Sequence, residues 1–136
     1  MSDDGKAAQP SAGLARPGQI LYLDDEEPLV FLVTRLLRRM GYEPLGFIDP
    51  AQALAAFKSA PARFVLVMTD LSMPGANGLD FAAEILAVAP EARVAVLTGH
   101  IYPADIDRAR VLGVRAIEQK PLNFDELGPL VERLLR

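Results

Sequence analysis

The stretch ILYLDD at residues 20–25 decides the fold, because an unbroken apolar run ends there at two carboxylates. Three later apolar runs end in the same way, at Asp70, Thr98 and Lys120. Short unbroken apolar runs are typical of strands in a parallel sheet that is buried on both faces. The sequence therefore predicts a buried parallel sheet whose strands end in polar side chains.

Helical patterns separate these runs, so that strands and helices alternate from Gln19 onward. Such alternation predicts an α/β domain with crossover helices, here with five strands and five helices. The strand expected at 43–47 contains Pro44, which has no N–H to donate, so we expect it at an edge of the sheet. Right-handed crossovers that cover both faces favour a flavodoxin-like, doubly wound (βα)5 sandwich with strand order 2-1-3-4-5.

The first helix is expected to begin at Pro28 and to stop at Gly41. Its inner face is predicted from the helical spacing of six apolar residues, Leu29, Leu32, Val33, Leu36, Leu37 and Met40. Phe31 lies opposite that stripe, so we expect its ring to be exposed and to mark a partner-docking surface. A tolerated exposed apolar residue is the alternative interpretation.

The final helix is expected to turn its apolar residues inward from Leu127 to Leu134. Gly128 and Pro129 interrupt this pattern, and a proline inside a helix removes a hydrogen bond and clashes with the preceding turn. We expect a kink at this point, or a short separate turn before a helix that begins near Pro129.

Ligand chemistry in an open α/β sheet collects beyond the carboxyl ends of the strands. With the predicted order, the first and third strands are neighbours, so Asp24, Asp25 and Asp70 meet in one crevice. Carboxylates this close repel one another, so either a pKa rises or a cation neutralises them, and hard oxygen ligands favour Mg²⁺ over zinc or copper. Thr98 and Lys120 can hold phosphoryl oxygens while one carboxylate attacks phosphorus, so the sequence predicts a site for Mg²⁺ and a phosphoryl group.

The composition narrows the class of protein. A chain of 136 residues, 51% hydrophobic and 24% charged, fits one globular domain at 19–136. Residues 1–18 are rich in Ala, Gly, Pro and Ser, and we expect a disordered N-terminal tail there. The absence of cysteine excludes disulfides and thiolate metal sites, and a net charge of -4 argues against nucleic acid as a direct partner. No apolar stretch reaches the roughly 20 residues that span a bilayer, so we expect a cytoplasmic protein without a membrane partner.

Four motifs together resemble the receiver domain of bacterial two-component response regulators. They are LDDEEP at 23–28, TDLSMP at 69–74 with Gly78 four residues on, LTG at 97–99 and KP at 120–121. The resemblance runs from about Ile20 to the C-terminus, and the combination is highly specific. It implies that Asp70 accepts a phosphoryl group from a phosphohistidine of a histidine kinase or histidine phosphotransfer protein.

The same resemblance implies roles for the residues around Asp70. Asp25, Asp70 and the backbone carbonyl of Ser72 would bind Mg²⁺, with Asp24 assisting through water. Thr98 and Lys120 would contact the phosphoryl group, and the peptide between Lys120 and Pro121 would be cis. Phosphorylation would alter the binding of a downstream protein target. We expect a monomer or weak dimer, and we expect it to catalyse only its own phosphorylation and dephosphorylation.

The match has departures that bear on how the signal is passed on. Receivers often carry Tyr or Phe three residues before the lysine, where this chain has Ile117, so the aromatic part of the usual switch is missing. Ser72 and His100 lie two residues past Asp70 and Thr98, and we expect them to flank the approach of water and to modulate phosphate lifetime. An exposed loop histidine without a role is the alternative for His100.

Other interpretations remain open from the sequence. The domain can be a stand-alone receiver, which an unstructured start with its own Met1 favours, or a receiver excised from a hybrid sensor kinase or a longer regulator. An aspartate-nucleophile phosphatase is disfavoured, because such enzymes use a second Asp two residues after the nucleophile, where this chain has Ser72. A degenerate receiver that is never phosphorylated is disfavoured by the intact acidic residues, Thr98 and Lys120.

Overall fold

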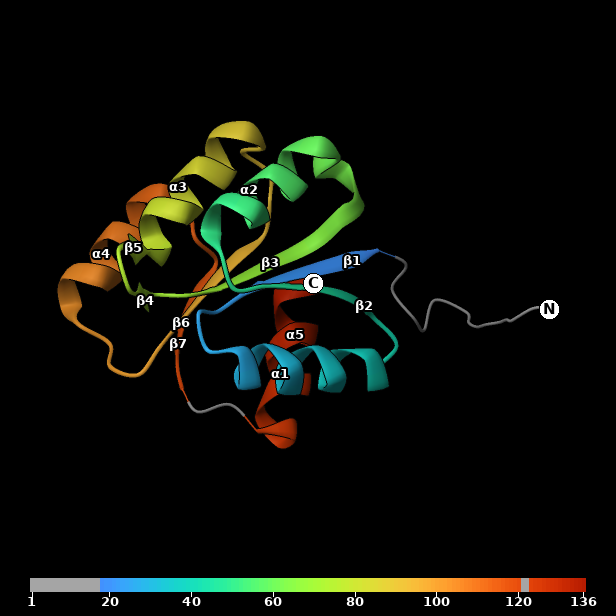
Figure 1. Cartoon of the computed structure of the whole chain (residues 1–136). Helices are drawn as coiled ribbons and strands as arrows, with labels where there is room; N and C mark the ends of the chain where they lie inside the picture. Colours follow the sequence, from blue (N-terminus) through green and yellow to red (C-terminus); the bar gives the residue numbers. More distant parts are fainter. Residues whose placement is uncertain (1–17, 121–122) are drawn as a thin grey trace.

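The computed structural model describes residues 18–120 and 123–136 (Figure 1). Five parallel strands form one sheet in the order β2-β1-β3-β6-β7. Their bounds are β1 Gln19–Leu23, β2 Glu43–Phe47, β3 Phe64–Asp70, β6 Val94–Thr98 and β7 Ala116–Gln119. Counted among these five strands alone, the order is 2-1-3-4-5, so the predicted doubly wound α/β fold and the edge position of β2 are confirmed.

Helices cover both faces of the sheet. Figure 1 shows α2, α3 and α4 on one face and α1 and α5 on the other. Their bounds are α1 Glu27–Arg39, α2 Pro50–Ser59, α3 Gly78–Val88, α4 Pro103–Leu112 and α5 Phe124–Leu135. A 3₁₀ turn at Pro61–Arg63 precedes β3, and a hairpin of β4 Ser72–Met73 and β5 Ala76–Asn77 precedes α3. No periodicity predicts this hairpin, because strands of two residues are too short to show one.

The strands are apolar without interruption because each contributes side chains to two hydrophobic cores, one on each face of the sheet. Successive side chains of a strand point to opposite faces, so Ile20 and Tyr22 pack with α1 and α5, while Leu21 and Leu23 pack with α2 and α3. All four side chains are buried. No helix among the described residues is both long enough and apolar enough to cross a membrane.

Helix α1 is rotated relative to the predicted inner face. Leu32, predicted to point inward, is 43% exposed, and Val30 packs against the core in its place. The cause lies in β2, where Gly46 has no side chain and Val30 fills the space that a Cβ would need. Phe31 is 66% exposed, which confirms its predicted position on the outer side of the helix.

Helix α5 runs without a break from Phe124 to Leu135, so the expected separate turn before Pro129 is wrong, while the alternative, a kink at this point, stays a prediction. Pro129 leaves the carbonyl of Asp125 without its helical donor, but both residues are exposed and water can replace the lost bond. A capping box between Asn123 and Glu126 supports the first turn. The buried residues Leu127, Leu130, Val131 and Leu134 hold the helix against the sheet.

Two expectations lie outside the described residues. They are the disordered tail at 1–18, of which the structure describes Gly18 alone, and the cis peptide before Pro121. The described domain extends from the strand that begins at Gln19 to the helix that ends at Leu135.

Gly78 lets α3 begin directly against the end of β3. Its N–H donates to the carbonyl of Leu71 at 2.7 Å, and a Cβ at this position would collide with the backbone carbonyl of Asp70. A backbone atom in a buried strand cannot move aside as a flexible side chain can. The close approach of Gly78 therefore helps to fix the position of Asp70.

We predict that Gly78→Ala destabilises the protein by about 3 kcal/mol or more, because the added methyl group overpacks the backbone at Asp70. Gly99→Ala is the matched control, since no atom outside its own chain neighbours lies within 4 Å of the place that its Cβ would take. Urea unfolding of both variants measures the difference. Equal midpoints for the two variants would show that the contact at Gly78 does not constrain β3.

Candidate functional site

The predicted site residues lie at the carboxyl edge of the sheet. Asp24 and Asp25 follow β1, Asp70 is the last residue of β3, Thr98 is the last residue of β6, and Lys120 follows β7. The three carboxylates each offer an oxygen, and these oxygens lie within 4.8 Å of one another. The predicted meeting of the first and third strands at one acidic crevice is therefore confirmed.

Lys120 connects two of these carboxylates. Its Nζ lies 2.8 Å from Oδ2 of Asp24 and 3.3 Å from Oδ1 of Asp70. The backbone N–H of Lys120 donates to the carbonyl of Thr98 at 2.7 Å. This bond holds the start of the loop after β7 against β6. The ammonium is thus placed between two buried acids by a backbone bond as well as by charge.

Asp24 is fully buried and every side-chain oxygen has a donor. Oδ1 accepts the N–H of Glu26 at 2.9 Å, and Oδ2 accepts Lys120 Nζ and the hydroxyl of Tyr22, the latter at 3.0 Å. The sequence pattern predicts Tyr22 only as an apolar strand residue. The signal that could have identified it is its spacing, because residues two apart on a strand point to the same face.

The pKa values of three groups at the site are raised, for reasons that differ from group to group. Burial, together with the charges of Asp24 and Asp25, raises the pKa of Asp70 to about 6, although Lys120 acts to lower it. Burial acts to lower the pKa of Lys120, but its bonds and charge contacts with Asp24 and Asp70 leave that pKa raised. Burial and the neighbouring Asp24 charge raise the pKa of Tyr22. At neutral pH the ammonium is therefore charged and the phenol is protonated.

The chemistry of the acidic cluster suits a hard divalent cation. Asp24, Asp25 and Asp70 supply three oxygen donors, and among the described residues no thiolate or imidazole belongs to this cluster. Asp25 is half-buried and Asp70 is 5% exposed, whereas Asp24 is fully buried. Because both oxygens of Asp24 already accept protein donors, Asp25 and Asp70 are the better direct ligands.

Thr98 lies at the edge of the site, but its hydroxyl is used elsewhere. The hydroxyl donates to the carbonyl of His100 at 2.9 Å and accepts the N–H of His100 at 3.2 Å. The ring of His100 is exposed and lies 4.4 Å from the ring of Tyr102, between centroids. The single proton of the Thr98 hydroxyl is therefore already donated to the backbone of His100.

A hollow of about 400 Å³ adjoins this loop, and its lining includes Ser72, Thr98, His100 and Tyr102. The two residues expected to flank incoming water, Ser72 and His100, thus line one hollow. Ile117, which stands where receivers often carry an aromatic switch residue, is half-buried and packs against the cluster around Val96.

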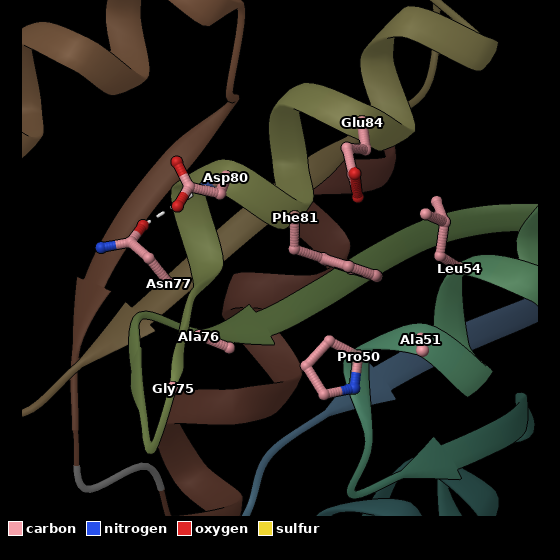
Figure 2. A pocket seen from close by; sticks show the side chains of 9 residues that line it. All are labelled: Pro50, Ala51, Leu54, Gly75, Ala76, Asn77, Asp80, Phe81 and Glu84. Atoms are coloured by element: carbon pink, nitrogen blue, oxygen red, sulfur yellow. Dashed lines mark hydrogen bonds between the residues drawn. The ribbon is translucent and has the colours of Figure 1, made fainter.

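A second hollow, of about 430 Å³, lies between α2, α3 and the β4–β5 hairpin (Figure 2). Leu54 and Phe81 form part of its apolar wall, and Glu84 lies at its side. Asp80 also lines it, but this carboxylate pairs with Arg108 of α4 at 2.6 Å. None of the predicted site residues lies in this hollow.

The sequence profile of the family described as response regulator receiver domain matches residues 20–132. The transcriptional regulatory protein PdtaR of Mycobacterium tuberculosis (strain CDC 1551 / Oshkosh) is 30% identical over 123 residues. That match covers 89% of this chain but 58% of PdtaR, so the chain spans less than two thirds of this relative.

Solved structures share the fold. The chemotaxis protein CheY4 of Vibrio cholerae matches with a TM-score of 0.82 at 24% identity, covering 88% of this chain and 100% of that chain. The response regulator TrrA of Thermotoga maritima, in complex with Mg²⁺ and BeF, matches with a TM-score of 0.76 at 33% identity. This second match covers 87% of this chain and 99% of TrrA.

We predict that Asp70→Asn stabilises the metal-free protein at pH 7, because it removes a buried negative charge that the folded state disfavours. The expected gain is about 1 to 2 kcal/mol, less than the full pKa shift implies, since water screens part of the cluster's charge. The pKa of Asp70 is about 6 in the folded state and 3.8 ordinarily, so the folded state holds the proton more tightly. Wild-type stability attributable to Asp70 is therefore full below about pH 4 and is lost as the pH rises through about 6.

Chemical denaturation in chelator from pH 4 to pH 8 tests this pH dependence. The advantage of Asp70→Asn should disappear toward pH 4. Asp107→Asn, in the exposed pair with Arg110, is the control and should show little change at any pH. An Asp70→Asn protein that gains no stability at pH 8 would contradict the raised pKa.

Proposed function

We propose that this chain, which belongs to the response regulator receiver domain family, accepts a phosphoryl group on Asp70 from the phosphohistidine of a partner kinase or phosphotransfer protein. The observation that carries the proposal is the setting of Asp70, a buried carboxylate beside two further acids and the ammonium of Lys120. A carboxylate that is incompletely compensated in this way is suited to act as a nucleophile.

In the proposed transfer, a carboxylate oxygen of Asp70 forms a bond to phosphorus as the P–N bond of the phosphohistidine breaks. The electron pair of that bond stays on the imidazole nitrogen. A phosphoimidazole that carries a proton on its other nitrogen then leaves as neutral imidazole, so the receiver needs no general acid. The exposed Ser72, which has no acidic group, is compatible with this chemistry and not with that of an aspartate-nucleophile phosphatase.

The remaining residues would stabilise the phosphoryl group. Lys120 would bind one phosphoryl oxygen as a point charge, and the hydroxyl of Thr98 would bind another after leaving the backbone of His100. Ser72 and His100, which line the adjoining hollow, would modulate the rate at which water removes the phosphoryl group.

Mg²⁺ is the cofactor that the acidic cluster fits. Asp25, Asp70 and the backbone carbonyl of Ser72 would hold it, with Asp24 assisting. When bound, the ion would neutralise charge between the carboxylates and the phosphoryl oxygens. A related receiver, TrrA, has been solved in complex with Mg²⁺ and BeF, which supports this assignment.

The proposed output is a change in the binding of a downstream protein, in a cytoplasmic two-component system or phosphorelay. The exchange of the bonds of Thr98 would move the loop that carries His100 and Tyr102. Because Ile117 has no aromatic ring, this loop would carry more of the signal than in receivers with an aromatic residue there. The same site would serve a stand-alone receiver or part of a longer regulator, and PdtaR exceeds this chain in length.

The docking surface for the phosphodonor would include the outer side of α1. This helix begins at Glu27, directly after the acidic residues, so its first turns lie beside the site. Phe31 is 66% exposed there, and Leu32 beside it is also exposed. Adjacent exposed apolar side chains of this kind are suited to insert between the helices of a partner.

We predict that a small phosphodonor adds a phosphoryl group to Asp70 and that the addition requires Mg²⁺. Intact-mass measurement after incubation detects the added group, and peptide mapping after borohydride trapping locates it. Asp70→Asn and chelator should each abolish it. A mass gain that persists in Asp70→Asn, or in chelator, would overturn the proposal.

We predict that Phe31→Ala slows phosphotransfer from the cognate protein donor by about tenfold, as expected for loss of an aromatic anchor. Phosphorylation by a small donor and thermal stability should stay nearly unchanged, because the ring is exposed. Val111→Ala is the matched control, since Val111 is an 86% exposed apolar residue on α4. Equal slowing by both variants would argue against docking through α1.

A further inference from the structure

Tyr22 combines a buried ring with a hydroxyl that reaches the functional site. The residue is 1% exposed and packs in the core that α1 and α5 share with the sheet. Its hydroxyl donates to Oδ2 of Asp24 at 3.0 Å. A leucine or phenylalanine could fill an apolar core position without a polar atom, so packing by itself does not account for the hydroxyl.

Two donors share the same oxygen of Asp24. Lys120 Nζ lies 2.8 Å from Oδ2, and the Tyr22 hydroxyl bonds to that oxygen as well. The remaining donor to Asp24, the N–H of Glu26, bonds to Oδ1. Among the described residues, Oδ2 therefore accepts from one donor on a long lysine side chain and from one donor on a ring buried in the core.

Phosphorylation of Asp70 would change the charges that surround the ammonium of Lys120. The ammonium already lies 3.3 Å from Asp70, and a phosphoryl group there would add negative charge next to it. As Lys120 turns to that charge, Oδ2 of Asp24 loses some or all of its bond to the ammonium. Asp24 is 0% exposed, so water cannot readily replace the bond, and an unpaired buried carboxylate oxygen is unfavourable.

We propose that Tyr22 is a positioning residue, whose hydroxyl keeps Asp24 bonded while Lys120 turns to the phosphoryl group on Asp70. This inference rests on the proposed function and goes beyond it in assigning a role to a core residue. The ring of Tyr22 is fixed between the sheet and its helices, so the hydroxyl stays at Asp24 when the ammonium moves. The free energy needed to redirect Lys120 is thereby lowered.

The role has a signature that loss of packing would not produce. Without the hydroxyl, Lys120 is the sole donor to Oδ2 among the described residues and is retained there more strongly. Binding of a phosphoryl group should weaken for that reason. Binding of Mg²⁺ should not weaken, because the change removes a hydrogen-bond donor from the acidic cluster and leaves its negative charge in place.

The test uses Tyr22→Phe in the full chain, with beryllofluoride as a mimic of the phosphoryl group. Titration calorimetry at saturating Mg²⁺ should give a beryllofluoride affinity about tenfold or more below wild type, the size expected for one hydrogen bond to a charged group. The affinity for Mg²⁺ should stay within about twofold. Small-donor phosphorylation, followed by intact mass, should slow in parallel with the loss of beryllofluoride affinity.

Two further variants separate positioning from general damage. Tyr42→Phe removes a hydroxyl from a half-buried tyrosine that precedes β2 at the opposite edge of the sheet, and it should match wild type in both titrations. In an Asp24→Asn background, Tyr22→Phe should have little further effect on beryllofluoride affinity, because the group through which Tyr22 acts has been altered.

Each outcome decides between distinct conclusions. Wild-type protein that binds no beryllofluoride overturns the proposed function and this inference together. Wild-type binding with an unchanged Tyr22→Phe overturns this inference alone. A Tyr22→Phe protein that loses Mg²⁺ affinity and thermal stability in parallel, or whose full effect persists with Asp24→Asn, has lost packing, and the positioning role is then refuted.

Discussion

One ammonium group between two buried carboxylates is the interaction on which the site depends. Lys120 lies 2.8 Å from Asp24 and 3.3 Å from Asp70, and both acids are buried. Removing carboxylates from water is costly and their charges repel, so the ammonium offsets part of both effects. The offset is incomplete, because the pKa of Asp70 stays raised to about 6. The site is thus short of positive charge, which favours a divalent cation.

The two acids differ in how far their charge is compensated. Asp24 accepts a backbone N–H, a phenol and the ammonium, so its bonding is complete within the protein. Asp70 has Lys120 at a longer distance and neighbours of its own sign. Complete bonding fixes the position of Asp24, whereas incomplete compensation raises the pKa of Asp70 and lowers the stability of the metal-free protein at neutral pH. If Asp70 is the phosphoacceptor, as we propose, stability and function place opposite demands on it.

Much of the site could be predicted because the relevant signals are local. The alternation of apolar runs with helical patterns specifies a doubly wound sheet, and right-handed crossovers deliver the ends of its strands to one edge. Asp24 and Lys120 are 96 positions apart in the chain and still form a hydrogen bond, because their strands end at that edge. A residue that ends an apolar run is visible in the sequence, and so is its place at the end of a strand.

What could not be predicted depends on contacts between distant elements. Leu32 is exposed because Val30 of α1 packs into the space that Gly46 of β2 leaves open. Helix α5 continues through Pro129 because its buried residues pack against the sheet. The bond from Tyr22 to Asp24 likewise requires the actual direction of a side chain. The sequence by itself determined the fold and which residues at the strand ends reach the site, since both follow from local pattern and chain topology. Only the tertiary structure decided how helices rotate and which donors each carboxylate receives, because packing against non-local neighbours sets those orientations.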